Sequence, residues 1–127
     1  MAQQEVRHLK TFDRLVTERK VRPTALEPVW RVAGFALGAA TALLGEKAAM
    51  ACTAAVEEVI DEHYASQLEH LESDEELKRT VTDFRNDEIA HRDEALMHGA
   101  EQAPGYRWLS EAIKSGCRLA IKLSERI

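Results

Sequence analysis

A Glu-x-x-His motif inside the apolar face of a predicted helix restricts the fold of this chain more than any other part of its sequence. At about 100° per residue, Glu88 and His91 fall within the stripe formed by Val81, Phe84 and Ala95. A carboxylate and an imidazole directed at a core are costly unless they are paired or bound to something. Because they lie one helical turn apart, they can reach a common point, as the metal ligands of helical bundles do.

The motif recurs at Glu5 and His8, again inside an apolar stripe. The simpler interpretation of one such pair is a buried salt bridge or a capped surface turn. A third inward carboxylate favours a metal site instead: Glu57 lies at the edge of the apolar face of its helix, whereas Glu58 is rotated by about 100° toward solvent. Carboxylates with imidazoles suit iron, manganese or zinc, and without a cation such crowded carboxylates would repel one another.

The composition predicts one soluble, helix-rich domain. The chain has 127 residues, with 45% hydrophobic and 31% charged residues and only three prolines. Its net charge of 17 − 22 = −5 argues against a nucleic-acid partner. Cys52 and Cys117 lie far apart among apolar residues, and we expect two reduced thiols.

Hydrophobic periodicity and helix-end signals predict five helices. Pro23 and Pro28 predict an extended connector over 21–28, because the residue before each proline is disfavoured in helical geometry. Ser73 and Glu76 form a predicted capping box at the start of the fourth helix, and Gly99 is its predicted end. The predicted helices span residues 3–20, 30–44, 46–71, 73–99 and 106–126.

Two helices have faces that suit a membrane surface or a partner. The apolar run from Val32 to Gly45 is shorter than the roughly 20 residues that cross a bilayer, so we expect a buried or interfacial helix. Gly34 and Gly38, four residues apart, would admit a close backbone or a lipid chain. In the last helix, cationic residues recur every four positions, which indicates either a solvated charged face or, with Trp108 near the interface, a stripe that rests on anionic headgroups. These residues are Lys114, Arg118, Lys122 and Arg126.

The remaining histidines carry weaker predictions. His63 shares a face with Val56 and Val59, which favours a hydrogen bond to a ligand carboxylate, although an ordinary core histidine fits nearly as well. Tyr64 beside it either contacts the metal ligands in the same way or only packs. His70 and His98 have no supporting pattern, and we expect both to be structural or exposed.

Several stretches go beyond a generic motif. With them, essentially the whole chain resembles the demethoxyubiquinone hydroxylase family of ubiquinone biosynthesis, di-iron carboxylate monooxygenases of ferritin-like fold. The GFALG and LSER runs, in particular, are not explained by helix periodicity. The matching stretches are 4–12 (QEVRHLKTF), 21–24 (VRPT), 34–38 (GFALG), 41–45 (TALLG), 49–53 (AMACT), Val56-Glu57-Glu58 with His63-Tyr64, Phe84-Arg85 with Glu88 and His91, 115–118 (SGCR) and 123–126 (LSER).

The resemblance implies a ligand set. Glu5 and Glu88 would bridge two irons, His8 would be a terminal ligand of one iron, and Glu57 and His91 would be terminal ligands of the other. The family has an earlier helix that supplies a further terminal glutamate. We therefore expect an all-α, ferritin-like di-iron bundle over residues 1–127, a single domain with five helices present and the first family helix missing.

The resemblance also implies an activity. Reduced di-iron would activate O2 and hydroxylate the ring of a demethoxylated polyprenyl quinone or quinol. Electrons would come from an external reductant, NADH being the one suggested, since the chain has no Rossmann fingerprint. The lipid-soluble substrate implies peripheral membrane contact, at the cytoplasmic face of a bacterial membrane or the matrix side of the mitochondrial inner membrane. The sequence leaves open whether the chain forms a homo-oligomer or receives its substrate from a lipid-presenting partner protein.

Two other functions fit the same pattern. A ferritin-like protein that oxidises or stores iron would use the same ligands, but it has no need for the apolar helix over 30–44. A metal-free bundle that binds a lipid or a partner protein is the other candidate, because one ligand-bearing helix of the family would be missing.

Overall fold

The computed structural model describes residues 1–127 as five α-helices and one short 3-10 turn, with no strand. This result confirms the all-α prediction and the number of helices. The elements are α1 (Ala2–Glu18), α2 (Glu27–Leu43), α3 (Glu46–Leu68), α4 (Glu75–Met97), the 3-10 turn η1 (Ala100–Gln102) and α5 (Tyr106–Ser124).

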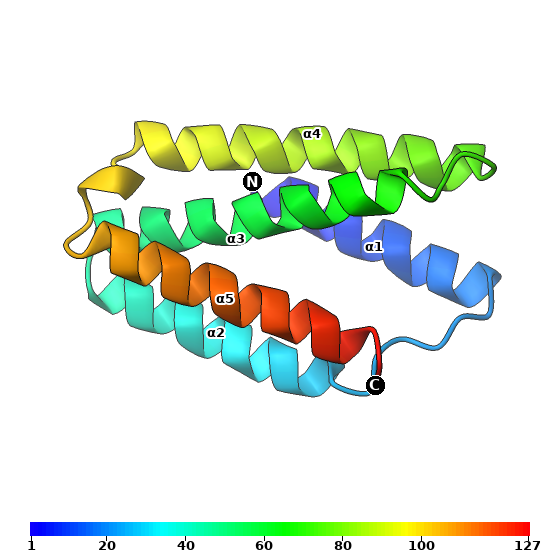
Figure 1. The fold of residues 1–127 in the computed structure, drawn as a ribbon, viewed down its shortest axis with the longest axis horizontal. Helices are drawn as coiled ribbons and strands as arrows, with labels where there is room; N and C mark the ends of the chain where they lie inside the picture. The colour runs from blue at the N-terminus through cyan, green and yellow to red at the C-terminus, as the bar shows by residue number, and fades with distance from the viewer.

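Helix α3 lies at the centre of the bundle, with α4 on one side and with α2 and α5 on the other (Figure 1). Small side chains on α3 let its neighbours approach closely. Ala51 and Ala54 pack with Ala95 of α4 and with the alanines of the η1 turn, while Ala55 packs with Ile113 of α5. The central helix is therefore fixed against both layers by alanine contacts, which also place its inward carboxylate.

Side-chain contacts hold α1 beside α4. The ring of Phe12 meets the ring of Phe84 edge to face, with their centroids 5.4 Å apart. Near the end of α1, Arg19 pairs with Asp74, and near its start Arg7 pairs with Asp83 at 3.0 Å. These contacts bring the first turns of α1 alongside the middle of α4.

Two predicted helix starts are wrong. Helix α2 begins at Glu27 and includes Pro28 in its first turn, so the connector lies over 19–26, two residues earlier than predicted. Proline is tolerated there because the N–H groups of a first turn have no partner inside the helix. The N-cap of α4 is Asp74, not Ser73: the Asp74 carboxylate accepts a hydrogen bond from the N–H of Leu77 at 3.2 Å.

The helix ends agree more closely with the prediction. Helix α3 stops at Leu68 and α5 at Ser124, each two or three residues earlier than expected. Helix α4 stops at Met97, and Gly99 follows with a φ of 94°, a left-handed conformation that side chains with a Cβ rarely adopt. The predicted glycine stop is confirmed.

Helix α2 is more exposed than its hydropathy suggested. Thr41 is its one buried residue, while Phe35 is 80% exposed and Leu43 is 89% exposed. A Cβ added at Gly34 or Gly38 would meet nothing within 4 Å, so no other backbone uses the space that these glycines leave. No helix combines the length and apolar character that crossing a bilayer requires.

The predicted cationic stripe of α5 divides into two parts. The ammonium of Lys114, only 12% exposed, lies 2.7 Å from Glu58 of α3, and Arg118 lies 3.0 Å from Glu62. These two cations are therefore paired with the neighbouring helix, whereas Lys122 and Arg126 are exposed. A continuous basic stripe is not formed. Both cysteines are free thiols, as predicted.

The corrected helix start is open to test by substitution. Asp74→Ala should lower the free energy of unfolding by about 1 kcal/mol, because it removes the N-cap of α4. Loss of the ion pair with Arg19 adds little, since exposed pairs contribute roughly 0–1 kcal/mol. Urea unfolding followed by circular dichroism measures the difference. Ser73→Ala is the matched control and should change the free energy by less than about 0.5 kcal/mol; a larger loss from Ser73→Ala would favour the capping box.

Candidate metal centre

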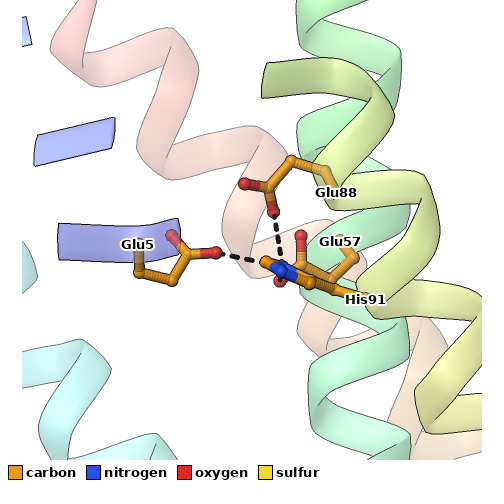
Figure 2. Close-up of side chains that lie close together, drawn as sticks. All are labelled: Glu5, Glu57, Glu88 and His91. Atoms are coloured by element: carbon orange, nitrogen blue, oxygen red, sulfur yellow. Dashed lines mark ion pairs between the residues drawn. The ribbon is translucent and has the colours of Figure 1, made fainter. Parts of the chain in front are cut away.

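Four of the predicted ligands meet at one point between three helices. Glu5 of α1, Glu57 of α3, and Glu88 and His91 of α4 each offer a ligand atom, and these atoms all lie within 4.8 Å of one another. Figure 2 shows Glu5 reaching across from α1 toward the side chains of the two other helices. The groups come from distant parts of the sequence, so the fold itself assembles the cluster.

The cluster is buried on the side of α3 and α4. Glu88 is 1% exposed, His91 2% and Glu57 7%, whereas the side chain of Glu5 is 49% exposed. Helix α4 buries Glu88 and His91 because they share its apolar face with Val81, Phe84 and Ala95, as the periodicity predicted. Water therefore reaches the cluster mainly past Glu5.

His8 completes the predicted set from the other side of Glu88. Its ring stacks on Phe84, with centroids 3.9 Å apart, and its Nδ1 lies 2.9 Å from Oε1 of Glu88. The other carboxylate oxygen of Glu88, Oε2, lies 3.7 Å from Nδ1 of His91. Glu88 thus stands between two imidazoles, one from each Glu-x-x-His motif.

The electrostatics of the cluster favour a bound cation. Burial and the neighbouring charge of Glu5 raise the pKa of Glu88 to about 8. Three buried atoms have no hydrogen-bond partner: Oε2 of Glu57, Oε2 of Glu88 and Nδ1 of His91. Buried polar atoms are nearly always satisfied, and Glu57, Glu88 and His91 each offer a ligand atom to the same point, so a bound cation would satisfy this group together. The residues present therefore fit a carboxylate- and imidazole-bound metal.

Two contacting residues were missed by the sequence analysis. Oδ2 of Asp87 lies 2.9 Å from Nε2 of His8 and 2.5 Å from Arg7, and these partners lower the pKa of Asp87. Oε1 of Gln4 lies 2.6 Å from Nε2 of His91. Each residue directly precedes the glutamate of a motif, which is the signal that could have drawn attention to them. Their partners lie on another helix and do not follow from one helical wheel.

The structure gives no hydrogen bond between His63 and the cluster; the predicted contact with a ligand carboxylate stays a prediction. His63 lines an apolar pocket with Phe12 and Leu15 instead. Burial and the charge of Glu5 raise the pKa of Tyr64 to about 12, so this phenol stays protonated beside the cluster. His70 and His98 are exposed.

Comparison with known proteins identifies the family. The model of the family described as "Ubiquinone biosynthesis protein COQ7" matches residues 1–124. The chain belongs to the COQ7 family. This family has a ferritin-like helical bundle, which confirms both the resemblance and the fold class inferred from the sequence.

The curated relatives carry hydroxylase names. Over all of this chain, 59% of residues are identical to a protein of Rhodospirillum rubrum named 3-demethoxyubiquinol 3-hydroxylase. Over 99% of the chain, 52% are identical to a rat protein named NADPH-dependent 3-demethoxyubiquinone 3-hydroxylase, mitochondrial. Over 98%, 42% are identical to a Saccharomyces cerevisiae protein named 5-demethoxyubiquinone hydroxylase, mitochondrial. The chain spans 60% of the length of each of these three relatives.

The assignment of helix faces predicts that an inward and an outward glutamate, Glu88 and Glu58, have unequal effects on metal binding. Glu88→Ala should abolish binding of Fe(II), because it removes the carboxylate between the two imidazoles. Glu58→Ala should leave binding nearly intact, because Glu58 pairs with Lys114 on the opposite side of α3. Iron content after anaerobic loading and desalting is the measurement, with circular dichroism to establish that both variants fold. Equal iron contents in the two variants would contradict the assignment.

Proposed function

We propose that this protein, as a member of the COQ7 family, uses O2 to hydroxylate the ring of a demethoxylated polyprenyl quinone or quinol in ubiquinone biosynthesis. The observation that supports this proposal most directly is the buried Glu88 held between two inward imidazoles. The names of the relatives supply the substrate class and the reaction.

The proposed cofactor is a pair of iron ions. Glu57 and His91 would hold one iron, His8 would hold the other, and Glu5 and Glu88 would bridge them. When bound, the irons supply the redox chemistry that activates O2. The protein's own contributions are to orient the imidazoles, to keep the carboxylates of α3 and α4 out of water, and to leave one side of the site open past Glu5.

An apolar pocket offers a place for the substrate. It has a volume of about 590 Å³ and lies between α1, α3 and α4. Val81, in its lining, lies on the same helix as Glu88 and two turns away, roughly 10 Å along the axis. Phe12 and His63 line it from the other two helices. A quinone ring or the first units of an isoprenoid tail match this lining chemically.

The reductant would be a reduced nicotinamide cofactor. The sequence suggested NADH, and the mammalian relatives are named NADPH-dependent. We propose that either cofactor delivers electrons from outside the bundle, directly or through the quinone.

We also propose peripheral contact with a membrane. Val32, Phe35 and Leu43 lie on one stripe of α2 and are 70%, 80% and 89% exposed. A stripe of this kind suits the headgroup and acyl boundary that a polyprenyl substrate occupies. The eukaryotic relatives are named mitochondrial, so the matrix side of the inner membrane is proposed for a eukaryotic source and the cytoplasmic face for a bacterial one. A second copy or a lipid-presenting protein would compete for the same stripe.

The activity is tested with the iron-loaded protein. The Fe(II)-loaded chain is incubated with a short-tailed demethoxyquinone, NADH or NADPH, and ¹⁸O2. Mass spectrometry should then detect a quinone product that contains one ¹⁸O atom. Glu58→Ala should retain the activity, and Glu88→Ala should lose it. Oxidation of iron without a hydroxylated quinone would favour the ferritin-like alternative. Protein that binds no iron would favour the metal-free bundle.

The membrane contact is tested by vesicle binding. Val32→Ser should weaken partition onto phospholipid vesicles by about 1 kcal/mol, or roughly fivefold, because it removes a buried methyl pair at the interface. Val6→Ser, which changes an exposed valine of α1, is the matched control and should leave partition unchanged. Sedimentation with vesicles measures both variants. A similar loss in both would contradict a contact through α2.

A further inference from the structure

Each imidazole of the candidate metal centre contacts, through its outer ring nitrogen, the residue that directly precedes the other Glu-x-x-His motif. Asp87 directly precedes Glu88, and its Oδ2 lies 2.9 Å from Nε2 of His8. Gln4 directly precedes Glu5, and its Oε1 lies 2.6 Å from Nε2 of His91. The two contacts are reciprocal: α4 holds the histidine of α1, and α1 holds the histidine of α4.

Both contacts turn the same ring nitrogen inward. An ionised carboxylate and an amide oxygen only accept hydrogen bonds, so Nε2 of each ring donates its proton outward. Nδ1 then carries a lone pair. In His8 this lone pair faces Oε1 of Glu88 at 2.9 Å, and in His91 it faces Oε1 of Glu5 at 3.1 Å. A lone pair directed at carboxylate oxygens is arranged for a cation, or for a proton held on the carboxyl group.

We propose that Asp87 and Gln4 are positioning residues, which fix the ring orientation and the Nε2–H tautomer of His8 and His91 and thereby set the metal affinity of the two sides of the centre separately. Asp87 acts on the side bounded by His8, and Gln4 acts on the side bounded by His91. The inference rests on the proposed metal centre but needs neither a quinone substrate nor hydroxylase activity.

Asp87 is charged and Gln4 is neutral, so the two residues affect the ligand nitrogens of His8 and His91 differently. A carboxylate that accepts the Nε2 proton makes the imidazole a stronger electron donor at Nδ1 than an amide does. His8 therefore has the ligand nitrogen that donates more strongly to a metal. The His8 side of the cluster has fewer carboxylate ligands nearby, since Glu57 groups with His91 and not with His8. The stronger donor nitrogen of His8 compensates for this difference in metal binding.

The chain contains a matched control for Asp87. Arg7 pairs with two carboxylates of α4, Asp87 at 2.5 Å and Asp83 at 3.0 Å. Removal of either carboxylate weakens the same attachment of α1 to α4, but only Asp87 contacts His8. A purely structural role would give Asp83→Ala and Asp87→Ala the same effect on the metal site.

The experiment is an anaerobic titration of the 127-residue chain with Co(II), whose absorption reports nitrogen and oxygen ligands. His8→Ala and His91→Ala first assign the spectral changes of the two sides. Asp87→Ala should weaken binding on the His8 side by about 10- to 100-fold, the usual effect of losing such an outer contact. Asp83→Ala should leave both sides within about twofold. Asp87→Asn keeps an acceptor and should lose less affinity than Asp87→Ala.

The same titration tests Gln4 against its neighbour. Gln4→Ala should weaken binding on the His91 side by a similar factor, whereas Gln3→Ala should change neither side. Gln3 is exposed, has no hydrogen-bond partner, and lies in the same turn of α1. Thermal melts of all six alanine variants in the titration establish that each one folds.

A second readout uses the metal-free protein. Nitrogen-15 NMR of the imidazole rings should show the Nε2–H tautomer of His8 in the wild type and in Asp83→Ala, and a mixture of tautomers in Asp87→Ala. Equal isotherms for Asp83→Ala and Asp87→Ala, an unchanged His8 tautomer in Asp87→Ala, or a wild-type chain that binds no Co(II) would each overturn the inference. If metal binding follows the predicted pattern but no quinone is hydroxylated, the inference stands and the proposed function fails.

Discussion

The burial of Glu88 between two imidazoles is the constraint on which the rest of the site depends. This carboxylate is 1% exposed and has Nδ1 of His8 on one side and Nδ1 of His91 on the other. An isolated buried carboxylate is strongly disfavoured in its charged form, which agrees with the raised pKa of Glu88. The surrounding fold holds the group at a position where a bound cation would stabilise its ionised form.

The packing around α3 and α4 supports this arrangement. Alanines at the contacts of α3 bring its backbone close to α4, and Glu57 thereby reaches the cluster despite its position at the edge of the apolar face. On the other side, Phe84 carries the ring of His8 at a centroid distance of 3.9 Å. A small-residue contact and an aromatic stack thus set the separation of the three helices that supply ligands.

Features that depend on a single helix were predicted correctly from the sequence in most cases. The choice of Glu57 over Glu58 and the inward direction of Glu88 and His91 follow from the angle between successive residues, and the structure buries each of the three. The glycine stop at Gly99 is equally local. The errors at Ser73 and Pro28 displace two helix starts by no more than three residues, and helix boundaries are the least certain part of any assignment.

Contacts between helices lay outside the reach of sequence reasoning. The partners of Asp87 and Gln4 depend on the register of α1 relative to α4, and the helical wheel of one helix gives no information about that register. The same limit applies to Lys114: its spacing from Arg118 suggested a stripe facing outward, but the register of α5 on α3 pairs both cations with Glu58 and Glu62.

Helix α5 has both buried and exposed apolar residues, since Ile113 packs on Ala55 of α3 while others face outward. Helix α5 turns two of its cations toward α3 and leaves Trp108 77% exposed and Leu119 58% exposed. Helix α2, on the same side of α3, exposes Phe35 and Leu43 (Figure 1). The exposed apolar groups of these two neighbouring helices would suit the hydrocarbon boundary of the proposed membrane contact. A polyprenyl substrate is found in such an environment, so the outer surface and the buried centre support the same proposed chemistry.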